Sequence, residues 1–512
     1  MRKTRSRSHG YNPRMKTEIE LKLTLPRRSL PALRRHPLVA SAPRAAPTAT
    51  LLNTYFDTPT LLLSKHRIAL RTRKQGRRWL QTVKADASSS GGLSARPEWE
   101  GPYSEAFDFS SIDAAETRKL LEGAAAELIP LFTTDFRRET RRLTPSPGIS
   151  MLMMIDQGKI AAGDRETPLC EVELELESGR PEDLYRLAIA LADELPLLPN
   201  DSSKAQRGLE LFHNRPALPM RAQPSPVRDT DSPLEAFRKV ALDGLRQWQA
   251  NALGAQQSDD PEWVHQMRVA LRRTRSAVKL FAHALPQEFV THWRGELRDA
   301  ASMLGEARDI DVLHAELIQP ILDDPASANR VEALSALVGG HREAAREHVR
   351  DWLSSHHQGA RMLRFAAGLE ALQGNPLDAS AKLQTFAALR LKHLRKRCRD
   401  RWADASGDNI EAHHLLRIAL KSLRYGIEFF EPLYPPKRLK AYRRRLSAAQ
   451  KRLGYLNDVA VGRTRLAQWA KDDAPLREAV AFVTGWHAPL AKAVRDSILD
   501  DTREFLWGRK PW

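Results

Sequence analysis

The hydrophobic period of this 512-residue chain changes once, and that change most limits what it can fold into. Before residue 215, short segments such as TEIELKL, WLQTVKA and LCEVELELE alternate apolar and polar residues, as half-buried strands do. After residue 233, long stretches such as VHQMRVALRRTRSAVKLFAHAL repeat apolar residues every three or four positions, as helices do. The intervening RPALPMRAQPSPVRDTDSP contains five prolines and no apolar period. The sequence therefore predicts an antiparallel β domain joined to an all-helical domain.

A chain of this length is too long for a single hydrophobic core, which favours two or more domains. We expect a basic tail at residues 1–15, a β domain at 16–214, a Pro-rich linker at 215–232 and a helical domain at 233–512.

The helical half contains an internal repeat. HQMRVALRRTRSAVKLF starts at His265 and HLLRIALKSLRYGIEFF starts at His414, an offset of 149 residues. LGEARDIDVL at Leu304 and LGYLNDVAVG at Leu453 have the same offset. Two pairs with one offset predict a duplicated helical bundle.

The composition limits the partners and the compartment. A formal net charge of +18 favours polyanions such as nucleic acid, anionic lipid or phosphate polymers. The two cysteines, Cys170 and Cys398, form no CxxC pair, which argues against a disulfide framework or a zinc module and fits a reducing cytoplasm. No segment approaches the roughly 18 apolar residues of a membrane span, and no apolar region follows the basic N-terminus. We therefore expect a cytoplasmic protein without a membrane segment.

Charged side chains line one face of several predicted strands. In TEIELKL the residues Glu18, Glu20 and Lys22 share a face, and LCEVELELE places four glutamates together. Such a face is either solvated or lines an enclosed site, and the alternation fits both interpretations. A row of glutamates repels itself unless cations lie near. Carboxylates without His or Cys suit Mg²⁺ or Mn²⁺, and basic rows suit phosphate oxygens, so the combination favours metal-assisted phosphoryl transfer.

The β half resembles the CYTH group, the triphosphate tunnel metalloenzymes. EIELK, TYFDT, LRTR, TVK, IDQG, CEVELELE and SKAQRG follow in that family's order over about residues 17–212. The resemblance implies an α+β domain: a closed, eight-stranded antiparallel β-barrel with flanking helices, whose charged interior admits linear triphosphates and uses Mg²⁺ or Mn²⁺.

The resemblance also implies roles for individual residues. The expected metal ligands are Glu18, Glu20, Asp156, Glu171 and Glu173. The expected substrate-binding residues are Lys22, Arg71, Arg73, Lys84, Arg138, Lys204 and Arg207. Arg137 is the alternative to Arg138, because adjacent strand residues face opposite ways. Asp156, Glu173 and Lys22 are expected to act in catalysis, and Glu98, Glu100 and Glu175 to support the binding residues.

The two helical repeats each carry a row of basic residues on one helix face, which we call the basic ridge. Its members are His265, Arg268, Arg272, Arg275 and Lys279 in the first copy and His414, Arg417, Lys421 and Arg424 in the second. A solvated face neutralised by acids would explain one such row, but repetition favours a binding surface for a polyanion. Acids in GEARDIDVL (Glu306, Asp309 and Asp311) are expected to cap helices or pair with the ridge.

The duplicated H-x-x-R-x-x-L-[RK] motif resembles the CHAD domain over about residues 233–510. That resemblance implies an all-α duplicated bundle that binds long-chain polyphosphate. The second copy has Ser422 where the first has Arg273, so the two halves are not equivalent. No aromatic residues interleave the ridges, which makes nucleic acid a poor candidate.

Together these features predict a hydrolase that cleaves inorganic triphosphate to pyrophosphate and phosphate in the barrel, with polyphosphate bound by the helical domain. Thiamine triphosphate hydrolysis, cyclisation of ATP as in a class IV-type adenylate cyclase, and a non-catalytic polyphosphate-binding scaffold remain open. The contact between the domains and the oligomeric state also remain open.

Overall fold

The computed structural model describes residues 16–85, 88–372, 382–405 and 409–512. The predicted basic tail at 1–15 lies outside them. The chain divides into two compact units, the first reaching Leu218 and including Ser355–Ala367, the second formed by Pro219–Ser354 and Gly368–Trp512. The described residues 215–232 contain no helix or strand.

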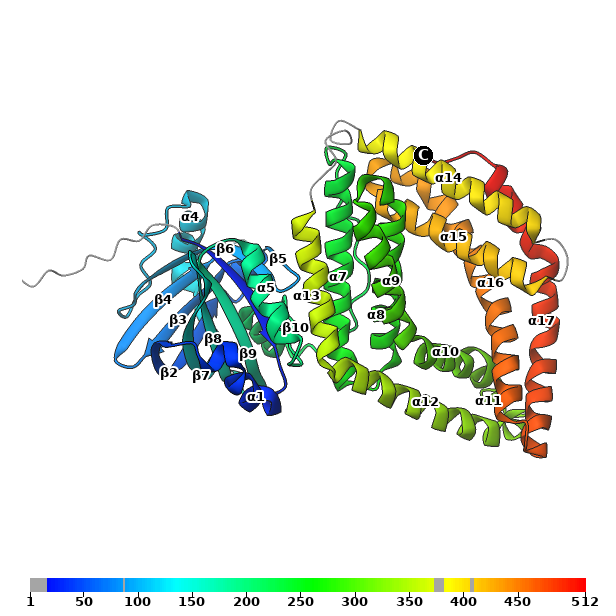
Figure 1. The fold of residues 1–512 in the computed structure, drawn as a ribbon, viewed down its shortest axis with the longest axis horizontal. Coiled ribbons are helices and arrows are strands. Elements are labelled where there is room, and N and C mark those ends of the chain that lie inside the picture. Colours follow the sequence, from blue (N-terminus) through cyan, green and yellow to red (C-terminus); the bar gives the residue numbers. More distant parts are fainter. Residues whose placement is uncertain (1–15, 86–87, 373–381, 406–408) are drawn as a thin grey trace, which may run out of the picture. The chain divides into compact units, whose positions relative to one another are not determined.

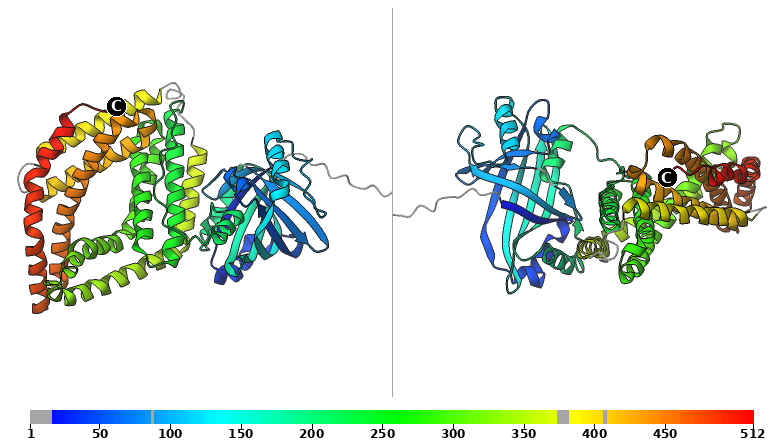
Figure 2. Two further views of the ribbon diagram at one scale, coloured as in Figure 1. Left: turned by 180° about the vertical axis from the view of Figure 1, so that it is seen from behind. Right: turned by 90° about the horizontal axis from the view of Figure 1, so that it is seen from above.

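The first unit is a closed β-barrel, whose strands curve around a common axis in Figures 1 and 2. Around the barrel the strands follow the order β1-β9-β8-β7-β2-β3-β4-β6, and β1 also pairs with β6, which closes a ring of eight antiparallel strands. This confirms the fold expected for the β half. Two short strands lie outside the ring, β5 on β6 and β10 on β1. The strands are β1 (Lys16–Thr24), β2 (Arg44–Asp57), β3 (Ala69–Gln75), β4 (Arg78–Lys84), β5 (Ser88–Ser90), β6 (Leu93–Pro102), β7 (Ile129–Ser146), β8 (Ile149–Ala162), β9 (Arg165–Ser178) and β10 (Leu198–Pro199).

Both faces of β1 are buried, for different reasons. Leu21 and Leu23 face outward and are 0% exposed. Helix α5 (Pro181–Ala192) packs on β1 and β9 with its own apolar face. Burying each such leucine contributes about 1.5–3 kcal/mol, so the helix-covered outer face stabilises the barrel. Glu18 and Glu20 point into the barrel on the other face of the same strand.

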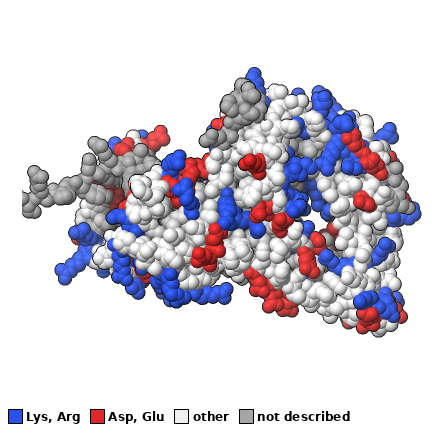
Figure 3. All heavy atoms as spheres, in the orientation of Figure 1, with Lys and Arg blue, Asp and Glu red and all other residues white. Residues whose placement is uncertain are grey.

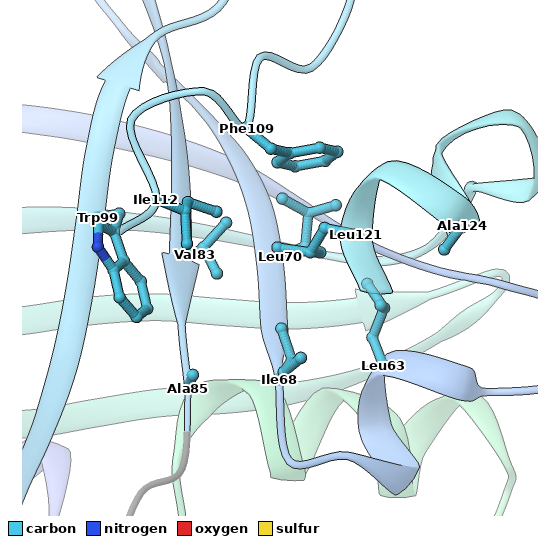
Figure 4. Packing of buried hydrophobic residues seen from close by; sticks show 10 residues of the cluster. All are labelled: Leu63, Ile68, Leu70, Val83, Ala85, Trp99, Phe109, Ile112, Leu121 and Ala124. Atoms are coloured by element: carbon cyan, nitrogen blue, oxygen red, sulfur yellow. The ribbon is translucent and has the colours of Figure 1, made fainter. Parts of the chain in front are cut away.

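A second apolar layer covers the outside of β3, β4 and β6 (Figure 4). Leu70, Val83 and Trp99 project from these three strands toward α4 (Ala115–Ala124), where Leu121 is fully buried. Because strand side chains alternate, their sequence neighbours project inward. The remaining helical segments of this unit are η1 (Arg27–Ser29), α1 (Leu30–Arg35), α2 (Pro37–Ala40), α3 (Leu62–Lys65), η2 (Ala125–Glu127) and α6 (Lys204–Phe212).

Helix α6 lies against β7, β8 and β9. Ala205 and Leu209 pack on Tyr55, Phe132 and Ile160 at one end of the barrel. Gly208 is required at this contact, because a Cβ there would lie 2.0 Å from the Phe132 ring. Ser203 caps the helix by accepting a hydrogen bond from the backbone of Gln206. The cap and the glycine fix where Lys204, the first residue of α6, enters the barrel.

The regular elements of the second unit are all helices among its described residues. Its segments are α7 (Pro233–Gln257), α8 (Pro261–Leu280), η3 (Ala282–Ala284), α9 (Gln287–Met303), α10 (Gly305–Leu313), the π-helical η4 (His314–Ile318), α11 (Gln319–Leu322), η5 (Ala328–Arg330), α12 (Glu332–Ser354), α14 (Leu383–Asp404), α15 (Ile410–Phe430), η6 (Glu431–Leu433), α16 (Pro436–Trp469) and α17 (Ala474–Trp507). Helix α13 (His356–Ala371) belongs to the first unit as far as Ala367. None of the described helices is long and apolar enough to cross a membrane.

The predicted repeat is visible in the helix boundaries. α8 begins after the capping residue Asp260 and α15 after Asn409, which stand 149 residues apart. The short helices η3 and η6 follow each at the same offset. Phe281 and its counterpart Phe430 meet with ring centroids 5.3 Å apart. The two copies therefore share an aromatic core.

Candidate active site and basic groove

The barrel encloses a cavity of about 740 Å³ lined mainly by charged side chains. From β1, Glu18 accepts a hydrogen bond from Nζ of Lys84 at 2.6 Å. Glu20, 2% exposed, pairs with Arg96 and accepts a hydrogen bond from the Ser94 hydroxyl at 3.2 Å. The charged face of this strand is therefore the enclosed one.

Three carboxylates from β8 and β9 form a buried cluster beside β1. One oxygen each of Asp156, Glu171 and Glu173 lies within 4.8 Å of the others. The β8–β9 register places Asp156 opposite Glu171. Nζ of Lys204 lies 2.7 Å from Asp156 and 2.9 Å from Glu173, and it also contacts Glu171. Arg138 on β7 pairs with Asp156 and Glu173, at 2.6 Å in each case. Two cations thus neutralise much of this charge.

The two glutamates of the cluster have pKa values shifted in opposite directions by their surroundings. Burial disfavours both charged forms, but Lys204, Arg138 and Lys22 outweigh it at Glu173 and hold its pKa well below the usual range. At Glu171 burial, with the neighbouring Glu173 and Asp156, wins and raises the pKa. Burial disfavours the charged form of Lys204, but the negative charges of Asp156, Glu171 and Glu173 outweigh this effect and raise its pKa. The site therefore holds an ammonium between carboxylates that differ in proton affinity.

The opposite wall, formed by β3, β4 and β6, is basic and internally supported. Glu98 lies 3.3 Å from Lys84 and 3.8 Å from Arg71, and Glu100 lies 3.6 Å from Arg73. Burial and the neighbouring Arg71 and Arg138 lower the pKa of Arg73 to about 10. Positive charges crowded in this way are suited to an anion that enters the cavity.

Most of the predicted barrel residues converge on this one space. Those that line the cavity are Glu18, Lys22, Arg71, Arg73, Lys84, Glu98, Glu100, Arg138, Glu173, Glu175 and Lys204. Glu20, Asp156 and Glu171 are buried in its wall. Arg207 does not line it: its guanidinium lies 3.6 Å from Glu171 and donates to the Pro168 carbonyl at 2.8 Å. Arg137 is exposed, whereas Arg138 points inward.

Among the lining residues that sequence reasoning missed are Arg96 and Tyr55, which contact the predicted site residues. Arg96 bridges Glu18, at 3.5 Å, and Glu20. It shares the strand period of Glu98 and Glu100, so the alternation of β6 contained the signal. Tyr55 accepts a hydrogen bond from Arg71 at 3.3 Å. Burial raises the phenol pKa, but Arg71, Lys204 and Arg73 outweigh it and lower the pKa overall.

The helical unit contains a second charged cavity, of about 400 Å³, which we call the basic groove. Its cationic and imidazole lining is His265, Arg268, Arg272, Arg308, His414, Arg417, Lys421 and Arg465. Six of these residues form three pairs related by the 149-residue repeat: His265 with His414, Arg268 with Arg417, and Arg272 with Lys421. Figure 3 shows Lys and Arg side chains gathered around the hollow of this unit.

The groove concentrates positive charge that few acids offset. Arg268 lies 3.2 Å from Asp309 and donates to the Gly305 carbonyl at 2.8 Å. Burial, together with Arg272 and Arg417, lowers the pKa of Lys421 to about 6. Burial and Arg308 lower the pKa of His265 to about 4, so this histidine is neutral near pH 7.

Part of the basic ridge lies outside the groove. Arg275 does not line it, Lys279 lines a different pocket, and Arg424 pairs with Glu428 at 3.4 Å. Arg273 pairs with Glu428 at 3.5 Å. Neither Arg273 nor Ser422 lines the groove, so this difference between the two copies does not change its lining.

Two of the three acids of GEARDIDVL lie where the expected roles place them, and the third does not. Asp309 pairs with the ridge, and Glu306 lies in the first turn of α10. Asp311 instead binds Arg342 and Arg346 of α12, at 3.0 Å each.

Comparison with known proteins identifies both halves. The family model of the CYTH domain matches residues 16–209, and that of the CHAD domain matches residues 239–467. An inorganic triphosphatase of Haemophilus influenzae is 33% identical over 156 residues, 30% of this chain and 44% of that protein. An uncharacterized protein of Mycobacterium tuberculosis is 27% identical over 406 residues, covering 74% of this chain and 76% of its own length. The crystal structure of the CHAD domain from Ricinus communis superposes with a TM-score of 0.50 at 31% identity, covering 58% of this chain and 99% of that domain.

Proposed function

This chain belongs to the proteins that join a CYTH domain to a CHAD domain, and on that premise we propose that its barrel hydrolyses inorganic triphosphate to pyrophosphate and phosphate. One observation carries the proposal: a buried cluster of three carboxylates and a wall of cations meet in a single cavity of about 740 Å³. The similarity to the Haemophilus triphosphatase supports it, although the matched region spans less than half of that protein.

The basic wall would bind the substrate. Arg71, Arg73 and Lys84 offer guanidinium forks and an ammonium to phosphate oxygens, and Glu98 and Glu100 hold these side chains in place. Lys22, 3.9 Å from Glu20 and 4.0 Å from Glu173, lines the cavity beside the acidic cluster. It would neutralise charge on the phosphoryl group that is transferred, which is the main task of a protein in this chemistry.

The acidic cluster fits a hard divalent cation. Its donors are carboxylate oxygens alone, close enough to share one ion, which suits Mg²⁺ or Mn²⁺. Asp156, Glu171 and Glu173 would hold the ion, with Glu18 and Glu20 as further ligands on β1. When bound, such an ion neutralises phosphate charge and favours an attacking water. Asp156 and Glu173 would orient that water as hydrogen-bond acceptors.

The basic groove would bind long-chain polyphosphate. Its cations come from both copies of the repeat, and among the described lining residues only Asp309 and Asp458 are acidic. A linear polyanion would replace the mutual repulsion of these cations by charge-assisted hydrogen bonds. Bound in this way, the polymer would keep the protein close to phosphate chains.

A second candidate substrate is an organic triphosphate, such as thiamine triphosphate or ATP. Leu131, Phe132 and Leu209 line part of the barrel cavity and would accept an apolar group.

The proposed triphosphatase activity is tested by measuring phosphate release from inorganic triphosphate by the full chain with Mg²⁺ or Mn²⁺. Glu20→Ala and Lys22→Ala should abolish release, while Glu116→Ala on the exposed side of α4 should not change it. Unchanged turnover in a folded Glu20→Ala, Lys22→Ala double variant would overturn the assignment of the reaction to this cavity. No metal-dependent phosphate release by the folded parent chain would instead leave a polyphosphate-binding scaffold.

A further inference from the structure

The helical unit has a third pocket, of about 350 Å³, which neither the barrel nor the basic groove includes. It lies between α8, α14 and α15. Its polar lining includes the cations Lys279, Arg390, Lys396 and Arg397, and its apolar lining includes Leu280, Leu394 and Phe429. We call it the α14 pocket.

Three of the four cations of the α14 pocket lack a carboxylate partner, although Arg390 also lies over the Phe386 ring. Asp400 is its one acidic residue among those described, and it already pairs with Lys396 at 3.1 Å. Lys279, Arg390 and Arg397 form no ion pair with any described carboxylate. Burial, then Arg397, lowers the pKa of Lys279, as expected where positive charges crowd. Lys279 is exposed and Arg390 and Arg397 are half-buried, so these cations repel one another across the cavity, and an anion bound there would relieve the repulsion.

The internal repeat shows that the fold does not require these cations. At the 149-residue offset, Arg390, Lys396 and Arg397 of α14 correspond to Ala241, Gln247 and Trp248 of α7. All three α7 residues are at most 2% exposed. One copy therefore buries neutral side chains at the positions where the other copy presents cations to a cavity.

We propose that the α14 pocket is a second anion site of the helical unit, which binds the phosphate group of a ligand whose remaining part packs on Leu280, Leu394 and Phe429. Lys279, Arg390 and Arg397 bind the phosphate. Tyr425 links the site to the basic groove, because it lines the pocket and accepts a hydrogen bond at 2.7 Å from Arg272, which lines the groove. The phosphate belongs either to a separate organic phosphate or to an inorganic chain that continues from the groove along α8.

Pyridoxal 5′-phosphate tests the site in the full chain, because it carries both a phosphate and a planar ring. Its aldehyde condenses with the Lys279 amine with loss of water, borohydride reduces the imine, and peptide mapping locates the label. We expect at least tenfold more labelling at Lys279 than at the exposed Lys440 of α16. Arg390→Ala and Arg397→Ala should each lower it about tenfold, and Arg401→Ala, outside the pocket on the same helix, should not.

Competition on the unaltered chain identifies the source of the phosphate. Protection of Lys279 by ATP at lower concentration than by inorganic chains assigns the pocket to organic phosphates; the reverse order assigns it to the chain. Labelling of Lys279 no stronger than that of Lys440, or no protection by either anion, overturns the proposal. The readout is a covalent label, so the outcome does not depend on triphosphatase activity in the barrel.

Discussion

Nζ of Lys204, the first residue of α6, lies 2.7 Å from Oδ2 of Asp156 on β8, inside a cluster of three buried carboxylates. The ammonium stands where a divalent cation would meet the same oxygens. Each cation therefore opposes the binding of the other, unless Lys204 turns toward a phosphate group in the cavity. On the proposed function, Lys204 would therefore affect both metal binding and substrate binding.

Lys204→Ala should separate these two effects. Without the ammonium, Asp156, Glu171 and Glu173 repel one another, so we expect a lower Tm in EDTA and a larger rise in Tm with Mn²⁺ than in the parent chain. Turnover should fall, because a phosphate contact is lost. Thermal melts with and without Mn²⁺ measure the first effect. Glu210→Ala, exposed on the same helix, is the control, and an equal Mn²⁺ response in all three proteins would contradict this account.

Arg138 and Arg137 offer a matched comparison on one strand. Arg138 points into the cavity and binds two carboxylates of the cluster, whereas Arg137 is exposed. Removing one partner of a buried ion pair lowers the free energy of unfolding by about 3–5 kcal/mol, because the other charge stays buried without compensation. We expect Arg138→Ala to lower kcat/KM for triphosphate at least 100-fold and Arg137→Ala to change it less than twofold. Similar losses in both variants would show that β7 does not face the site as described.

Arg96 should matter although no motif identified it. It pairs with the buried Glu20 and also lies 3.5 Å from Glu18, so Arg96→Gln leaves two carboxylates less compensated. We expect a loss of kcat/KM of roughly 10-fold to 100-fold, about what one lost charge-assisted contact costs. Initial rates provide the measurement, with Arg78→Gln on the exposed start of β4 as the control. A rate equal to that of the parent would exclude Arg96 from the site.

The basic groove should bind polyphosphate with a dependence on pH. Lys421, with its pKa lowered to about 6, is largely neutral above pH 6 in the free protein. A bound polyanion favours the charged form, so binding takes up a proton and affinity falls as pH rises from 6 to 8. One proton allows at most about a tenfold change per pH unit. Lys421→Arg should flatten the slope because its guanidinium stays charged, while Lys440→Arg should not. Equal slopes in both variants would contradict the assignment.

The sequence predicts the inward face of β1 because two signals agree: the alternation of side chains along each strand and the order of the motifs along the chain. Alternation groups Glu18, Glu20 and Lys22, and the acidic and basic rows of other strands explain why that face is enclosed. The same alternation shows that Arg138 and Arg137 face opposite sides of their strand, so only one of them can enter the barrel. These features are local to each strand, so they can be read without coordinates.

Contacts between distant elements could not be predicted in this way. Lys204 reaches Glu171 and Glu173 only because the α6 cap and Gly208 set the position of the helix against β7. In the helical unit, α8 carries one continuous basic face, yet Arg272 lines the groove and Lys279 lines the α14 pocket. The division occurs where α8 packs on α15, and helical periodicity contains no information about that crossing.

The most direct test of the account is the substrate preference of the full chain, measured as kcat/KM for inorganic triphosphate, pyrophosphate, long polyphosphate, ATP and thiamine triphosphate with Mg²⁺ and with Mn²⁺. We predict that inorganic triphosphate is hydrolysed at least tenfold more efficiently than any other member of this panel, that pyrophosphate accumulates as a product, and that EDTA abolishes the reaction. A higher kcat/KM for ATP or thiamine triphosphate, or no metal-dependent phosphate release from triphosphate by the folded chain, would contradict the proposed function.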